Sequence, residues 1–379
     1  MNRIIGLFVA IVVCGWSIAA DPPQSLDKAR TLVQSLGDRS FRTREKANDE
    51  LVRMGREAYA AVAEGANHSD AEIRCRCQKI LPAILDQELK ARLDAFLSDT
   101  DGKHEHALPG WKRFCSQFGN TAANRSLFAN LIRADMRAME ETENSTVEVA
   151  TMRLQARCQV LQQHQMMAAN TGMGATISLR DIVQAMFLAT RPGLDLPIVT
   201  AQYITMFTYQ ATFHQGISNS ENSDVIRKLT VAWFEKRLDD PNTCYAIQNL
   251  ASRFKFSEAA PVVSKLVGNK KATPHVRAVA ITTLGVVGGK DDAKFLEPFL
   301  EDTTLVGNYQ WNNFKGTTQL GDVALAQVIR LHGKKPGDFG FSILKANPNF
   351  ANSYFYQGFA NDQERSAARK LWRDEMAKK

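Results

Sequence analysis

One helical phrase constrains the fold more than any other feature of this sequence. Residues 273–289 read TPHVRAVAITTLGVVGG, in which Arg277 is followed by Ala280, Leu284 and Gly288. These offsets place the two apolar residues on one face of a helix, with the arginine near its start and the glycine at its end. The valines 276, 279 and 287 widen the same face. The pattern predicts a helix with one broad buried side.

A second helix is expected directly after this one. Asp291 and Asp292 favour the start of a helix shortly after Gly288-Gly289 in the sequence. Its buried side would be formed by four apolar residues, Phe295, Leu296, Phe299 and Leu300. Together the two segments predict a helical hairpin.

The offsets of the phrase recur near both ends of the chain. Arg44 is followed by Ala47, Leu51 and Gly55, and Arg74 by Cys77, Leu81 and Leu85. Asp322 is followed by Leu325, Ile329 and Gly333, in a copy that lacks the arginine. Acidic residues precede the first two copies, and we expect Asp38 and Asp70 to cap those helices. A helix pair that recurs in this way cannot bury its apolar side alone, so it predicts stacked repeats.

The recurring pattern resembles the HEAT-repeat family of armadillo-type α-solenoids. The residues that carry the resemblance are Asp70-x-x-x-Arg74-x-x-Cys77 and Val276-Arg277-x-x-Ala280-x-x-x-Leu284-Gly285. The resemblance is faint in the middle of the chain, around Arg153 and Arg227. It implies an all-α protein of stacked antiparallel helix pairs whose long surfaces bind other macromolecules, and it implies no catalytic residues. We expect the recurrent arginine to be structural, bonding the loop or cap of an adjacent repeat.

Four regions follow from these patterns. Residues 1–20 have the layout of a secretory signal peptide, with Arg3, an apolar stretch from Ile4 to Val13, and small residues before Asp21. Residues 21–95 are expected to hold the N-terminal repeats, and residues 96–240 a helical middle region of degenerate repeats. Residues 241–379 are expected to hold the C-terminal repeats, irregular aromatic loops and a terminal helix. The protein is thus predicted to be exported, periplasmic or extracellular, without a transmembrane anchor once the signal is cleaved.

Composition narrows the possible partners. The chain is 44% hydrophobic and 23% charged, with a formal net charge of +7. Its basic residues form no clustered stripe, which makes a nucleic-acid partner unlikely. The numerous methionines of the middle region, Met152, Met166 and Met167 among them, are expected to fill the core rather than to line a groove.

Two aromatic-rich segments stand out near the C-terminus. The first, GNYQWNNFKG, contains Tyr309, Trp311, Asn312, Asn313 and Phe314. Aromatic rings flanked by amides suit recognition of sugars or peptides, and these five residues are the candidate binding site. The second segment, NPNFANSYFYQGF, carries five aromatic residues from position 350 to position 359. Each segment could instead cover the open end of the repeat array.

No catalytic residue, metal ligand or cofactor site is predicted. His104-Glu105-His106 is the densest group of possible metal ligands, but its spacing is too short for both histidines to share a helical face. A solvated loop is expected there. Cys75 and Cys77 would lie about 200° apart on a helix, so they cannot chelate one ion, and Cys77 is expected to be buried. Cofactors are therefore expected to be none.

Three functions remain open from the sequence alone. The first is an exported, non-catalytic scaffold or binding protein that recognises a protein, or a glycan, on an α-solenoid surface. The second is an enzyme or accessory lyase built on a HEAT-like frame, as in some bilin-attachment proteins. A self-associating structural module is a third possibility, and the sequence does not specify an oligomeric state.

Overall fold

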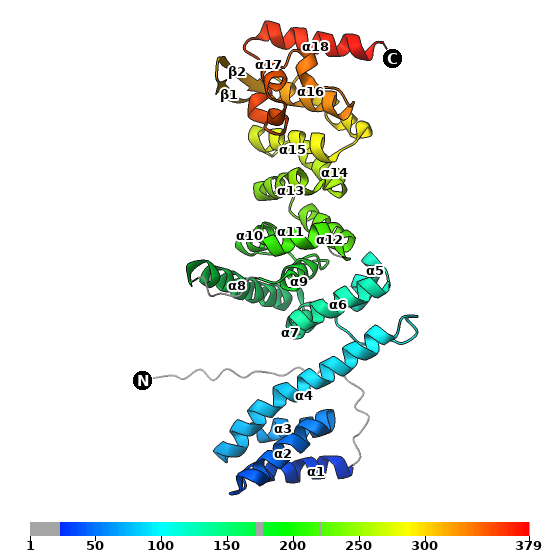
Figure 1. The fold of residues 1–379 in the computed structure, drawn as a ribbon, viewed down its shortest axis with the longest axis vertical. Helices are drawn as coiled ribbons and strands as arrows, with labels where there is room; N and C mark the ends of the chain where they lie inside the picture. The colour runs from blue at the N-terminus through cyan, green and yellow to red at the C-terminus, as the bar shows by residue number, and fades with distance from the viewer. Residues whose placement is uncertain (1–22, 172–176, 220, 379) are drawn as a thin grey trace. The chain divides into compact units, whose positions relative to one another are not determined.

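The computed structural model describes residues 23–171, 177–219 and 221–378 (Figure 1). Over these residues the chain is mostly helical, with eighteen α-helices and a single two-stranded sheet. The prediction of a mainly helical fold is confirmed at this level. The predicted signal peptide, residues 1–20, lies outside the described residues.

The chain divides into two compact units, one ending at His106 and the other beginning at Ala107. The first unit contains α1 (Pro23–Ser35), α2 (Phe41–Met54), the 3-10 helix η1 (Gly55–Ala58), α3 (Tyr59–Gly65) and α4 (Ala71–Ser98). Its core is formed by small and aliphatic side chains from all four α-helices, including Val33, Leu51, Val62 and Ile80. Each helix thus buries one stripe against the others.

The recurrent arginines of the first unit make the same contacts. Arg44 Nη1 donates to the carbonyls of Asp38 (2.8 Å) and Arg39 (3.1 Å). Arg74 Nη1 donates to the carbonyls of His68 (2.6 Å) and Ser69 (3.1 Å). In both cases the acceptors lie six and five residues before the arginine. The guanidinium therefore ties down the loop that leads into its own helix, a contact that the pattern did not predict. The expected contact with an adjacent helix start is also found at Arg44, whose Nε pairs with Glu72 in the first turn of α4 (3.2 Å).

Of the two predicted helix caps, one is confirmed and one is wrong. Asp70 caps α4, accepting from the amides of Glu72 and Ile73, but Ser40 and not Asp38 caps α2. Asp38 instead accepts a hydrogen bond from the Ser40 amide (2.7 Å).

The buried stripe of α4 differs in part from the expected one. It consists of Ile73, Cys77, Ile80 and Ile84, whereas Leu85 is exposed. The buried positions are spaced by four, three and four residues, the usual spacing of a helix with one apolar face. Of the positions expected from Arg74, Cys77 is buried and Leu81 is partly buried against this core, so only Leu85 departs from the prediction.

The second unit contains the remaining elements. In chain order the α-helices are α5 (Trp111–Phe118), α6 (Ala122–Ala134), α7 (Met136–Glu143), α8 (Val147–Thr171), α9 (Leu179–Ala189), α10 (Ile198–Phe207), α11 (Ala211–Asn219), α12 (Ser223–Glu235), α13 (Pro241–Phe254), α14 (Ala260–Val267), α15 (Pro274–Val287), α16 (Leu320–Leu331), α17 (Ser342–Ala346) and α18 (Asp362–Met376). The 3-10 helices are η2 (Ser257–Ala259), η3 (Lys290–Phe295), η4 (Glu297–Phe299), η5 (Pro336–Phe339), η6 (Pro348–Asn352) and η7 (Tyr354–Tyr356). The strands are β1 (Leu305–Trp311) and β2 (Phe314–Gln319).

The helical phrase of residues 273–289 forms α15, which is buried on nearly every side. Thr273 caps its start and Gly288 follows its end, as the pattern predicts. α15 packs against α13, α14 and α16. The Arg277 guanidinium pairs with Asp302 at 3.4 Å, a carboxylate farther along the chain, as Arg44 does with Glu72.

The second helix expected after α15 does not form. Residues 290–295 and 297–299 make the short 3-10 helices η3 and η4. Leu296 between them is buried, whereas Phe295 at the end of η3 is exposed. Pro298 has no amide hydrogen to continue an α-helical ladder, which accounts for the break. The expectation of an irregular aromatic loop after it is also wrong, because residues 305–319 form a β-hairpin.

Candidate binding surface

The tip of the β-hairpin brings together the aromatic residues of the first segment. β1 and β2 pair antiparallel, and Trp311 and Phe314 are the last pair before the two-residue turn Asn312-Asn313. Asn312 adopts a left-handed conformation (φ 51°), which asparagine tolerates better than most residues. The rings of Trp311 and Phe314 stack with their centroids 6.0 Å apart and 13° between their planes.

The second aromatic segment meets the first at this tip. The Phe350 ring lies edge-on to Trp311, with 5.1 Å between centroids, and stacks on Tyr356 at 4.2 Å. We call Trp311, Phe314, Phe350 and Tyr356 the aromatic cluster. All four side chains are half-buried. The sequence marked both segments, but nothing in it indicated that residues about 40 positions apart would share one surface.

Backbone pairing joins the two segments. Thr317 of β2 and Phe359 exchange amide–carbonyl hydrogen bonds of 3.0 and 3.1 Å, so the second segment extends the hairpin by one bridge. The Thr318 hydroxyl donates to the carbonyl of Phe355 (2.9 Å). Gly316 and Gly358 permit this approach, because a Cβ atom at either position would collide with the opposite backbone.

Buried amides fix the second segment to α16. Gln327 Nε2 donates to Gln357 Oε1 (2.7 Å), and both side chains are fully buried. Arg330 Nη1 donates to Gln327 Oε1 and to the carbonyl of Ala351, each at 2.8 Å. Burial lowers the pKa of Arg330 from its ordinary value. The segment is thus held by a connected polar network, which favours one arrangement of its aromatic rings.

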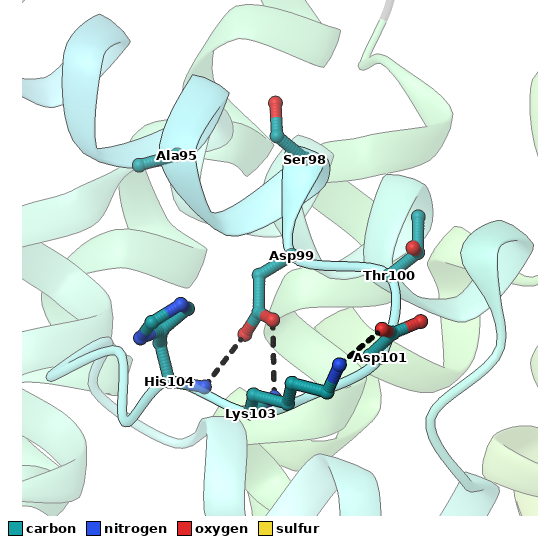
Figure 2. A pocket seen from close by; sticks show the side chains of 7 residues that line it. All are labelled: Ala95, Ser98, Asp99, Thr100, Asp101, Lys103 and His104. Atoms are coloured by element: carbon teal, nitrogen blue, oxygen red, sulfur yellow. Dashed lines mark hydrogen bonds and ion pairs between the residues drawn. The ribbon is translucent and has the colours of Figure 1, made fainter.

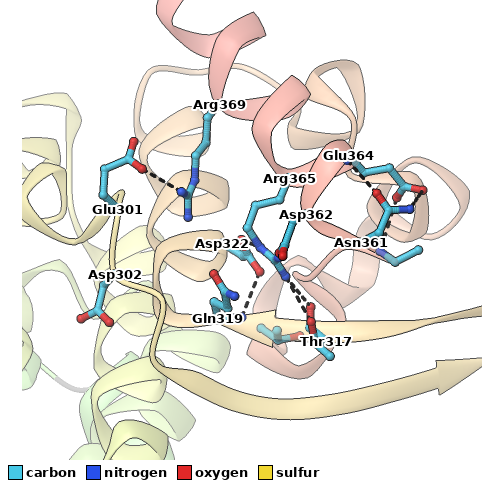
Figure 3. A network of polar contacts seen from close by, with 12 residues as sticks. Glu301, Asp302, Thr317, Gln319, Asp322, Asn361, Asp362, Glu364, Arg365 and Arg369 are labelled. Carbon is cyan, nitrogen blue, oxygen red and sulfur yellow. Dashed lines mark hydrogen bonds and ion pairs between the residues drawn. The ribbon is translucent and has the colours of Figure 1, made fainter.

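An ion pair between α16 and α18 supports the base of the hairpin (Figure 3). Arg365 Nε donates to Asp322 Oδ1 (2.7 Å), and both side chains are almost completely buried. The backbone amide of Gln319 donates to Asp322 Oδ2 (2.9 Å), and Arg365 Nη2 donates to Thr317 Oγ1 (3.1 Å). Burial raises the pKa of Asp322, and the hydrogen bond with Arg365 opposes that shift.

The five residues predicted as a binding site divide into three groups. Asn312 and Asn313 are exposed at the turn, and Trp311 and Phe314 are half-buried beside them. Tyr309 is buried, with 8% of its surface exposed, and burial raises its pKa to about 12. Tyr309 lies two residues before Trp311 and so shares its side of β1, but its hydroxyl lies beside Gly316 rather than in solvent. Its part in binding stays a prediction.

The loop around His104 lies in the first unit and is partly ordered by one carboxylate (Figure 2). Asp99 accepts from the amides of Lys103 (3.0 Å) and His104 (3.1 Å), and its Oδ2 lies 2.9 Å from His106 Nε2. The expectation of a solvated loop is therefore wrong for His106, whose side chain is largely buried. A hollow of about 320 Å³ opens beside Asp99, lined also by Ala95 and Asp101.

No group of three or more potential metal ligands is found among the residues that the structure describes. Within the same residues, no helix is both long and apolar enough to cross a membrane. A scan against protein-family models finds no match to the chain, and a search of curated proteins finds none either.

Proposed function

We propose that the protein is an exported, non-catalytic binding protein whose helices stack as a HEAT-like α-solenoid. The repeated geometry of Arg44 and Arg74 supports the repeat, since two helices place one guanidinium on carbonyls at the same two offsets. The N-terminal pattern of residues 1–20 supports export. The partner is a protein or a glycan.

The aromatic cluster is the observation that carries this proposal. Its four half-buried rings lie beside the exposed amides of Asn312 and Asn313, and no charged side chain is among these six residues. Rings of this kind offer a large contact area at little entropic cost, and the amides add directional hydrogen bonds. The polar network beneath holds the rings before a partner arrives, which lowers the cost of binding.

The proposal is tested with Trp311→Ala and Phe350→Ala in the full chain. Phe295→Ala is a matched control, since Phe295 is an exposed aromatic residue outside the cluster. Each protein is immobilised, exposed to an envelope extract of the source organism and to a panel of soluble oligosaccharides, and the retained molecules are identified by mass spectrometry.

We expect one partner to be retained by the wild type and the control and lost from both cluster variants. Loss of two or more kcal/mol of binding free energy is typical of a central aromatic residue. Equal retention by all four proteins would remove the cluster from the binding site.

A further inference from the structure

The middle of the second unit exposes apolar side chains that the sequence suggested would be buried. Met152, Met166 and Met167 of α8 are 61, 55 and 56% exposed. The prediction that the methionines of the middle region fill the core is confirmed for Met139, which is fully buried, and wrong for these three. The core side of α8 is formed by Ala150, Leu154, Cys158 and Leu161, on the opposite face of the helix.

The neighbouring helix α10 also exposes apolar side chains. It packs against α8, and Ile198 and Val199 are 67 and 56% exposed at its start (Figure 1). Met206 and Tyr209 are exposed farther along the same side. We define the α8–α10 face as the exposed side chains of seven residues, Met152, Val160, Met166, Ile198, Val199, Met206 and Tyr209.

The α8–α10 face carries almost no charge. α10 contains no charged residue, and neither does the sequence from Leu196 to Asn219 if His214 is neutral. On α8 the last charged residue is Arg157, and beyond it only His164 and the buried Cys158 can titrate. Glu148 and Arg153 lie near Met152, at the margin of the face. An apolar centre with charges at its margin is the composition of a protein interface, in which methionine and aromatic residues are enriched.

The exposed area is that of a small protein interface. With roughly 150 Å² for each whole side chain, the exposed parts of these seven residues total on the order of 500 Å². A patch of that size is as large as the largest one on a typical monomer, and it is often functional. Weak complexes bury less than about 600 Å² on each partner, so a patch of this size suits a dimer of moderate affinity.

We propose that the α8–α10 face binds the same face of a second copy of this chain, forming a two-fold symmetric dimer. A symmetric interface must complement itself, and an uncharged apolar face does so without placing like charges opposite one another. This matters for a chain with a formal net charge of +7, whose copies repel one another elsewhere. The dimer is independent of the aromatic cluster, so either proposal can fail alone.

The test measures the molar mass of the full chain by sedimentation equilibrium from about 1 to 100 μM, concentrations that span moderate protein affinities. The variants are Ile198→Glu and Met206→Glu, which place a carboxylate within the face. Leu371→Glu is the matched control, because Leu371 is 49% exposed on α18. Far-ultraviolet circular dichroism of each variant checks that it is folded.

We expect the wild type and Leu371→Glu to be dimers and both face variants to be monomers, with dissociation constants raised at least about 100-fold. A wild type that is monomeric throughout would overturn the proposal. Oxidation of Met166 and Met206 by hydrogen peroxide would then show whether the face is open or covered by another part of the chain. A dimer that withstands both face substitutions would also overturn it.

Discussion

At the scale of single residues, burial makes three of the cysteine thiols unreactive. Cys77, Cys158 and Cys244 are almost completely buried, and burial raises their pKa values to about 11, 12 and 12. The thiolate is the reactive form, so these three thiols are protonated and inert at pH 8. Cys75 lies two residues from Cys77 but is exposed.

We therefore expect iodoacetamide at pH 8 to alkylate Cys75 and to leave the three buried thiols unmodified in the native protein. Peptide mass spectrometry of native and urea-unfolded samples measures the difference. Equal labelling of Cys75 and Cys77 would show that α4 is not oriented as described.

Asp70, the N-terminal cap of α4, predicts that the stability of the fold depends on pH. The pKa of Asp70 is lowered below 3.8, chiefly because its carboxylate accepts from the amides of Ile73 and Glu72. A carboxyl group whose pKa is lower in the folded state stabilises that state above its unfolded pKa. The contribution is lost as the pH falls through the folded value.

Asp70→Asn keeps a capping oxygen but removes the charge, so it isolates this effect. We expect the wild type to be the more stable protein at pH 7, and the difference to disappear as the pH falls through the lowered pKa of Asp70. Urea unfolding at a series of pH values measures it. Asp49→Asn, at an exposed position within α2, is the control. A difference that is the same at pH 7 and at pH 2.5 would contradict this explanation.

At the scale of elements, the hairpin depends on close packing at Gly316. Its missing side chain leaves room for the Phe359 carbonyl and the Tyr309 hydroxyl. Gly316→Ala is expected to cost about 1–3 kcal/mol, as overpacking does, and to separate β2 from the second aromatic segment. Gly289→Ala is the matched control, since a Cβ atom there meets nothing within 4 Å. Chemical denaturation compares the two, and equal stabilities would argue against the close packing.

The ion pair between α16 and α18 is a second element-scale contact. Arg365→Ala leaves the Asp322 carboxylate buried without its partner, which is expected to cost about 3–5 kcal/mol. Lys370→Ala, at an exposed position of α18, should change stability by less than about 0.5 kcal/mol. Urea unfolding measures both. A small effect of Arg365→Ala would show that α18 contributes little to the fold of the second unit.

The sequence predicted elements whose signals are local. Helical periodicity and terminal glycines located α2 and α15, and Gly55 adopts the positive φ (58°) expected where a helix ends. The hairpin was missed because its strands are short and their alternation mixes glycines with amides. Exposure was misjudged on α8, where methionines on the outer face look the same in the sequence as methionines in a core.

The candidate site could be predicted only in part for the same reason. Trp311, Phe314 and the turn asparagines were identified, since rings beside amides are a local signal. Their contact with Phe350 depends on the Thr317–Phe359 bridge and on the buried pair of Gln327 and Gln357. Those contacts join segments far apart in the sequence, which no periodicity specifies.

At the scale of the whole molecule, each of the two compact units has a core of its own. Leu51 is fully buried in the core of the first unit, and Leu284 is fully buried in α15 of the second. The first unit is the smaller one, and a small unit buries a lower fraction of its surface on folding, so it should be the less stable. We expect calorimetry of the full chain to show two transitions, the first belonging to this unit.

Two equivalent substitutions assign the transitions. Leu51→Ala and Leu284→Ala each remove a buried side chain, at a cost of about 2–5 kcal/mol. Leu51→Ala should lower the temperature of the first transition only, and Leu284→Ala that of the second only. Such independence is expected when two cores share no side chains, because substitutions at distant sites add. If either substitution shifts both transitions together, the two units unfold as one cooperative structure.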